Sequence, residues 1–162
     1  MIYAHDPELP RRMAEIEELA EELFYGLPGL IRTAIVVMKA GFSIEPFYWS
    51  PNRYPYQRCA KKVRVNEQPY KVVRPTSVVF QGGSNRAYVN ARYIPPQSVR
   101  EDLLFFPDID PNVLEWRRFY LVPREDFLRA GFKSNIPIPV GPKTSRCGPT
   151  PRLEWAKYAI EF

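Results

Sequence analysis

Apolar residues recur every three or four positions over residues 11–25 and again from Pro28 to about Ala40. This spacing is typical of amphipathic helices, and it places the glutamates of the first segment on the solvent side. Pro28 can occupy the first turn of the second helix, whose apolar residues cover more than one face and so predict a central, buried element. We expect Gly26 to end the first helix and Gly41 to cap the second.

After Gly41 the apolar residues alternate with polar ones, which is typical of β-strands. The predicted strands are short and are separated by turns rich in proline and asparagine. They cover residues 42–47, 57–65, 70–73, 77–80, 103–106 and 118–122. A short helix is expected to begin at about Arg124, and residues 153–162 close the chain as a mixed apolar element. The order of elements predicts a sandwich-like α+β domain with mostly antiparallel strands.

Composition narrows the class of protein. The chain has 162 residues, of which 45% are hydrophobic, and this is the size of one globular domain. Its 18 prolines, together with 20 tyrosines and phenylalanines, indicate short elements joined by stiff loops rather than a helical bundle or a disordered chain. No membrane-length apolar run and no secretory signal is found in the sequence, so we expect a cytoplasmic protein with no membrane partner.

The sequence offers little for metal or covalent chemistry. Cys59 and Cys147 cannot form a disulfide framework, and with His5 alone they cannot complete an ordinary zinc site. Whether the two cysteines meet is left open by their spacing. The sequence also holds no phosphate-binding P-loop, no dinucleotide fingerprint and no Ser/His/Asp set. We therefore expect neither a cofactor nor a metal ion.

The net charge of +5 is unevenly distributed. Residues 1–25 carry seven acidic residues and two arginines, so the remaining residues carry a net +10. The stretch from Arg53 to Arg74 holds seven basic residues, a single acid and three tyrosines, including Tyr70. Cations displace the counterions of phosphates and aromatic rings stack on bases, so this stretch predicts nucleic-acid binding, although a solvated basic surface with tyrosines packed in a sheet is a simpler alternative. The candidate contact residues are Arg53, Tyr54, Tyr56, Arg58, Lys61, Lys62, Arg64 and Lys71.

Four parts of the chain, in order, carry a family resemblance. They are GLIRTAIVVMKAGFSIEPF from Gly29, the pair PYQRCA and PYKVVRPTS, then REDLLFFPDIDPNVLEWRRFYLVPREDF, and the closing RLEWAKYAIEF. Together they resemble the PD-(D/E)xK nucleases, in particular the small group of homing endonucleases and Holliday-junction-resolvase-like proteins. The resemblance covers residues 26–162. It implies a restriction-endonuclease-like core, in which helices flank a mixed central sheet. The amphipathic helix predicted from the apolar spacing is an extra element before this core, in an acidic leader of residues 1–25.

The positions that would carry catalysis in this family are changed. Such nucleases hold Mg²⁺ with carboxylates and use a lysine to position water. Carried over by the resemblance, the helix glutamate falls on Leu30, the metal-binding aspartate on Gln57, the second ligand on Val73 and the lysine on Pro75. None of these side chains binds Mg²⁺, so the resemblance implies an inactive nuclease fold. Pro75 also removes a backbone donor, so the strand there is expected to break or to lie at an edge.

Three functions follow from these observations. The first is a catalytically inactive module that binds nucleic acid, with DNA favoured over RNA. The second is a structural or adaptor subunit of a larger nucleoprotein assembly, in which the helix at 11–25 docks on a protein partner or on a second copy, unless it folds back on its own basic core. The third is an active Mg²⁺-dependent nuclease with relocated ligands, in which Glu45 would act with Lys61 or Lys62.

Overall fold

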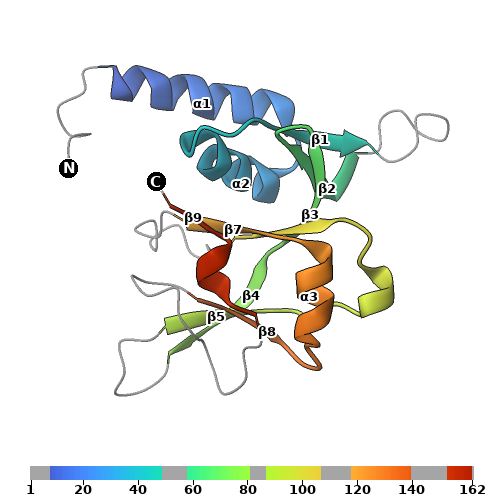
Figure 1. Ribbon diagram of the computed structural model, residues 1–162. Coiled ribbons are helices and arrows are strands. Elements are labelled where there is room, and N and C mark those ends of the chain that lie inside the picture. Colours follow the sequence, from blue (N-terminus) through green and yellow to red (C-terminus); the bar gives the residue numbers. More distant parts are fainter. Residues whose placement is uncertain (1–7, 49–57, 81–86, 107–117, 140–152, 162) are drawn as a thin grey trace. The chain divides into compact units, whose positions relative to one another are not determined.

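The computed structural model describes residues 8–48, 58–80, 87–106, 118–139 and 153–161 (Figure 1). The chain divides into two compact units, unit 1 at residues 1–68 and unit 2 at residues 69–162. The predicted α+β class is confirmed, since both helices and strands are present. Within the described ranges, no helix is long and apolar enough to cross a membrane.

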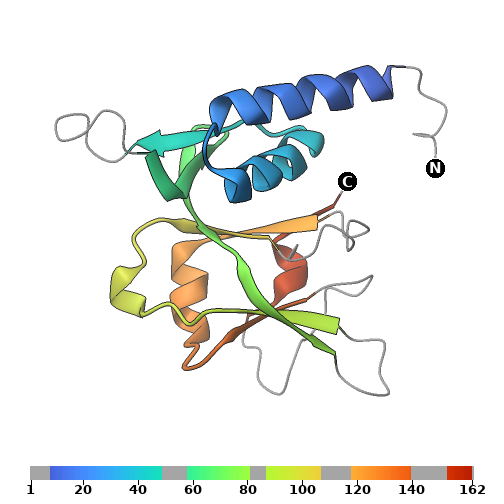
Figure 2. The same ribbon diagram turned by 180° about the vertical axis from the view of Figure 1, so that it is seen from behind.

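Unit 1 consists of two helices and a pair of strands. These elements are α1 (Leu9–Leu23), α2 (Pro28–Lys39), β1 (Ile44–Tyr48) and β2 (Arg58–Val65). Helix α1 lies along α2, which in turn contacts β1 (Figures 1 and 2). Strands β1 and β2 pair antiparallel, with Ile44 opposite Val65. Both predicted helices are confirmed, and Gly26 and Gly41 follow them at φ values of 78° and 90°, where a side chain would be strained.

One face of α2 contributes to the core of unit 1, together with buried residues of β1 and β2. The residues of α2 that are fully buried are Leu30, Thr33, Ala34 and Val37, and its other apolar residues are partly buried. Thr33 donates its hydroxyl hydrogen to the carbonyl oxygen of Gly29 at 3.2 Å, so this polar side chain is satisfied within the helix. The predicted burial is therefore confirmed for one face of α2, while the other apolar side chains of the helix are only partly buried.

Unit 2 holds a mixed group of strands and a second, smaller sheet. The first group runs in the order β3 (Gln68–Val73), β6 (Asp102–Phe105), β7 (Arg118–Val122) and β9 (Ala159–Glu161). Strands β3 and β6 are parallel, whereas β6, β7 and β9 pair antiparallel. The second sheet is antiparallel and contains β4 (Pro75–Phe80), β5 (Ala87–Ala91) and β8 (Ile136–Pro139). The predicted predominance of antiparallel pairing is confirmed.

The hydrophobic core of unit 2 draws on both of its sheets. One cluster contains buried residues of β3, β5, β6, β7 and β8. Helix α3 (Arg124–Ala130) adds Phe127 to this cluster, and the short 3₁₀ segment η4 (Trp155–Lys157) adds Trp155. The Trp155 ring lies edge-on to Phe105 and Tyr120, with ring centroids 5.1 and 5.0 Å apart. Edge-to-face aromatic pairs stabilise a core beyond the burial of their apolar area, and they favour one packing geometry.

The chain changes sheets next to Pro75. Strand β3 ends at Val73, and β4 begins at Pro75 and pairs with β5, so the predicted break in the strand is confirmed. Among the described strands, β4 is an edge of its sheet. Proline is tolerated at such a position because its missing N–H leaves no ladder bond unmade. Two strands of this sheet, β5 and β8, were not predicted from the sequence.

Candidate nucleic-acid interface

The structure places the predicted basic residues on two strands. Arg58 and Lys61 belong to β2 by their backbone position. Lys62 and Arg64 follow them on β2, and Lys71 lies on β3. The remaining candidates, Arg53, Tyr54 and Tyr56, lie outside the described residues. Gln57, the position at which the resemblance would place the metal-binding aspartate, lies outside them as well.

Side chains alternate along the second half of β2. Val63 and Val65 are buried, whereas Arg64 is exposed and Lys62 is half-buried. Because successive residues of a strand point to opposite faces, Lys62 and Arg64 share the face of β2 opposite the two valines. Arg64 Nη1 lies 3.6 Å from Glu45 Oε1 of β1. Both side chains are about half exposed, and such pairs contribute little to stability.

A tight turn positions the end of β2. Asn66 and Glu67 both have positive φ values, 47° and 72°, as a two-residue turn between strands requires. The Asn66 side chain accepts hydrogen bonds from the Ser43 backbone N–H at 2.9 Å and from the Ser43 hydroxyl at 3.2 Å. These bonds fix the turn to the start of β1 and thereby hold Arg64 near its acidic partner.

Beyond this turn, β3 is mostly buried. Tyr70 and Val72 are 8% and 6% exposed, and Lys71 between them is half-buried. Tyr70 therefore packs within the sheet, which is the simpler of the two roles predicted for the tyrosines of the basic stretch. Burial and the neighbouring Asp102 raise the pKa of the Tyr70 hydroxyl above its usual value.

Apolar packing fills the described positions at which the resemblance would place catalytic groups. Leu30 on α2 is 4% exposed, and Val73 at the end of β3 is 6% exposed within the core cluster of unit 2. Pro75 starts β4 and is partly buried. Glu45, the carboxylate considered for a relocated site, is paired with Arg64. Among the described residues, no group of three or more His, Cys, Asp or Glu side chains is arranged to hold a metal ion.

The solvent face of α1 is strongly acidic. Four of its exposed glutamates have no ion-pair or hydrogen-bond partner within the described part of the chain: Glu17, Glu18, Glu21 and Glu22. Arg11 pairs with Glu15 of the same helix at 3.2 Å. Leu19 lies among the glutamates with 45% of its surface exposed, and Tyr25 beyond the helix is 82% exposed. This face thus combines unpaired negative charge with apolar surface.

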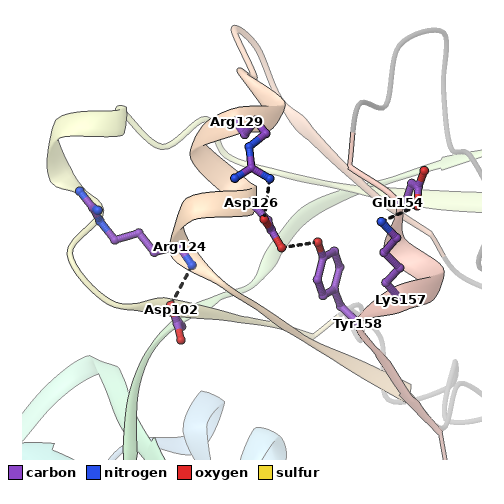
Figure 3. Close-up of polar contacts among 7 residues, drawn as sticks. All are labelled: Asp102, Arg124, Asp126, Arg129, Glu154, Lys157 and Tyr158. Carbon is purple, nitrogen blue, oxygen red and sulfur yellow. Dashed lines mark hydrogen bonds and ion pairs between the residues drawn. The ribbon is translucent and has the colours of Figure 1, made fainter.

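A group of polar contacts, not predicted from the sequence, holds α3 in unit 2 (Figure 3). Asp102 Oδ1 accepts a hydrogen bond from the Arg124 backbone N–H at 2.8 Å, which satisfies one free donor at the start of the helix. The Arg124 side chain donates through Nε to the Val99 carbonyl oxygen at 2.8 Å. These bonds connect α3 to the segment that enters β6.

The same helix is linked to the C-terminal segment through Asp126 (Figure 3). Its carboxylate accepts a hydrogen bond from the Tyr158 hydroxyl at 2.6 Å and another from Arg129 Nη1 at 3.1 Å. Burial and this hydrogen bond to Asp126 raise the pKa of Tyr158 to about 12. Asp126 and Tyr158 are 32 residues apart, so no local spacing in the sequence indicates the contact.

Loss of the Tyr158 proton should therefore destabilise the fold at high pH. A tyrosine whose pKa is higher in the folded than in the unfolded chain stabilises the fold fully below about pH 10 and loses that contribution as the pH rises towards 12. We expect the difference in unfolding free energy between the wild-type protein and Tyr158→Phe to shrink over this interval in urea titrations. A difference that stays constant from pH 9 to pH 12 would contradict the assignment. Tyr93→Phe, at an exposed tyrosine of the same unit, is the control.

The outcome for the site is mixed. Lys62 and Arg64 share one face of β2, while the aromatic candidates Tyr54 and Tyr56 lie outside the described residues.

Comparisons with models of protein families, with curated proteins and with solved structures find no match for this chain.

Proposed function

We propose that this protein binds nucleic acid through the basic stretch around β2, on a restriction-endonuclease-like fold that lacks catalytic metal ligands. The observation that carries the proposal is the alternation along β2, which buries Val63 and Val65 and leaves Lys62 and Arg64 on the other face. Cations arrayed along a strand suit the regular spacing of backbone phosphates. DNA is the favoured ligand and RNA the alternative.

The residues at the positions that the resemblance assigns to catalysis support binding without cleavage. Leu30 and Val73 are aliphatic and buried, and Pro75 has no side-chain ligand atom. Carboxylates at positions 30 and 73 would repel phosphates in the absence of a metal ion, and aliphatic side chains there remove that repulsion. The same changes that would abolish cleavage would therefore favour the binding of phosphates.

The test is the salt dependence of binding in a charge-neutralised variant. Lys62→Gln, Arg64→Gln and Lys71→Gln together should weaken binding to duplex DNA about tenfold or more at moderate salt. The slope of log affinity against log salt concentration should also become shallower by about two to three. Each phosphate contact contributes roughly 0.9 to that slope, and three cations are removed. Fluorescence anisotropy with duplex DNA, branched DNA and structured RNA measures both quantities.

The matched control changes three exposed cations of unit 1 outside the stretch, through Arg11→Gln, Arg12→Gln and Lys39→Gln. It carries the same change in net charge and should keep most of the affinity and slope. Equal losses in both variants, or wild-type binding that does not weaken as salt rises, would remove the proposal. Incubation of the wild-type protein with each nucleic acid and Mg²⁺ or Mn²⁺ should give no cleavage. If the wild-type protein cleaved a nucleic acid and Glu45→Gln abolished the cleavage, the protein would instead be an active nuclease that uses Glu45 as a relocated metal ligand.

A second candidate function, an adaptor in a nucleoprotein assembly, rests on α1. Its exposed Leu19 lies among glutamates that are unpaired in the described part of the chain. Leu19→Arg should dissociate an oligomer or a bound protein and leave the nucleic-acid affinity within about twofold, as measured by light scattering and anisotropy. Ala14→Arg introduces the same charge at another exposed position of α1 and should leave the assembly intact. A wild-type protein that is monomeric and retains no partner would exclude this role.

A further inference from the structure

One end of the second sheet of unit 2 brings basic residues together. Pro75 of β4 lies opposite Ala91 of β5, and Ala91 lies opposite Ile136 of β8. The start of β4, the end of β5 and the start of β8 therefore meet at the same end of the sheet (Figure 1). Arg74 directly precedes β4 and Arg92 directly follows β5. Because paired strands lie about 4.8 Å apart, the backbones of these two arginines are close neighbours.

A third cation lies at this end of the sheet. Lys133 belongs to the loop that leads from α3 into β8. Arg74, Arg92 and Lys133 are all exposed, and none of them has an ion pair or a hydrogen bond within the described part of the chain. The three chain segments that form this end contain no acidic residue: 69–80, 87–95 and 131–139. These segments therefore supply no carboxylate to neutralise the three cations.

An exposed aromatic ring accompanies the cations. Tyr93 follows Arg92 and is 38% exposed, and of the large apolar side chains described in unit 2 it alone is exposed. Ala91 and Ile94, on either side of this pair, are buried in the core cluster. The chain is thus anchored directly before Arg92 and directly after Tyr93. Groups that are held in place before binding lose less conformational entropy when a ligand binds.

Cations beside an exposed ring suit one class of ligand. Arginine and lysine side chains neutralise backbone phosphates and release their counterions. An aromatic ring stacks on a base whose face is free, as it is in a single strand. In a duplex, neighbouring base pairs cover that face. The combination of charge and ring therefore favours a single strand over a duplex.

We propose that this end of the second sheet binds single-stranded nucleic acid, with the three cations on its phosphates and Tyr93 stacked on a base. The surface lies wholly within unit 2 and shares no residue with the contacts named on β2 and β3, so it goes beyond the function proposed above. Failure of either proposal leaves the other standing.

The test starts from the charge-neutralised variant of the basic stretch, so that the stretch contributes little to the measured binding. In this protein Tyr93→Ala removes the ring, whereas Tyr93→Phe keeps a ring and removes only the hydroxyl. A separate double variant, Arg92→Gln with Lys133→Gln, removes two of the cations. Fluorescence anisotropy with an oligothymidylate, an oligouridylate and a hairpin duplex gives the affinities over a range of salt concentrations.

The matched control for the double variant is Arg100→Gln with Lys157→Gln. It makes the same change in net charge at two exposed positions of unit 2. Arg100 precedes β6, which begins beside Tyr70 and so lies at the far end of β3 from Arg74. Lys157 belongs to η4 and pairs with Glu154. The control should keep the affinity for single strands.

The charge-neutralised protein should bind at least one of the two single strands, and should bind it more tightly than the duplex. Tyr93→Ala should weaken this binding about fivefold or more, while Tyr93→Phe should stay within about twofold. Arg92→Gln with Lys133→Gln should make the slope of log affinity against log salt concentration shallower by about 1.4, because each phosphate contact on a single strand contributes roughly 0.7.

Three results would overturn the proposal. The first is the absence of binding to both single strands, or binding of the duplex at least as tightly. The second is an equal loss of affinity in Tyr93→Ala and Tyr93→Phe. The third is a change of slope in the control that matches the change in the double variant.

Discussion

Val73→Glu should unfold unit 2 rather than create a metal site. Val73 is 6% exposed in the core cluster and lies opposite Phe105 in the parallel pairing of β3 and β6. A carboxylate there would lose its hydration without gaining a partner, which costs more than about 3 kcal/mol. Urea unfolding followed by circular dichroism should show this loss in the free energy of unfolding.

The neighbouring exposed residue supplies the control for this substitution. Arg74→Glu introduces the same carboxylate one position later, outside the core, and should unfold at nearly the wild-type urea concentration. A folded Val73→Glu protein whose stability rises with added Mg²⁺ would show that the position opens into a metal-binding pocket, contrary to its packing here.

Trp155→Ala should produce the second large loss of stability, of about 3–5 kcal/mol. The indole is almost fully buried and contacts the rings of Phe105 and Tyr120, which belong to neighbouring strands β6 and β7. Its removal leaves a cavity between these strands and the C-terminal segment. Calorimetric or urea unfolding of the variant measures the loss.

Lys157→Ala is the matched control in the same 3₁₀ segment. Its side chain is exposed and pairs with Glu154 at 2.9 Å, three residues away, so its removal should change stability little. Comparable destabilisation by the two substitutions would show that the segment, rather than the buried indole, carries the effect. If Trp155→Ala unfolded with the same free energy as the wild-type protein, the packing described for unit 2 would be contradicted.

The elements that were predicted correctly are those whose local pattern agrees with their environment. Helices α1 and α2 carry a full helical apolar repeat between glycines, and β7 is a continuous apolar run that is buried on both faces, as Phe119 and Tyr120 show. Strand β5 was missed because Ala87–Ala91 is short and contains an asparagine. Strand β8 was missed because Pro137 and Pro139 are unfavourable in strands.

The same contrast holds for the candidate residues. Charge clustering is visible in the sequence, so the basic character of β2 was predicted, including Lys62 and Arg64. The contacts of Arg118 with Glu161 and of Tyr158 with Asp126 depend on pairing across β7, β9 and α3, between residues more than 30 positions apart. Such partners are set by tertiary structure, and one sequence contains no local signal for them.

The prolines of β8 have a consequence for how the protein behaves in concentrated solution. Strand β8 is an edge of the second sheet among the described strands, and Pro137 and Pro139 occupy alternate positions of it. Two of its four residues therefore lack the N–H that an incoming strand needs as a donor. An exposed strand edge normally invites pairing with another molecule, and proline is one of the residues by which natural sheets prevent it. The high proline content thus protects this sheet against aggregation by strand addition.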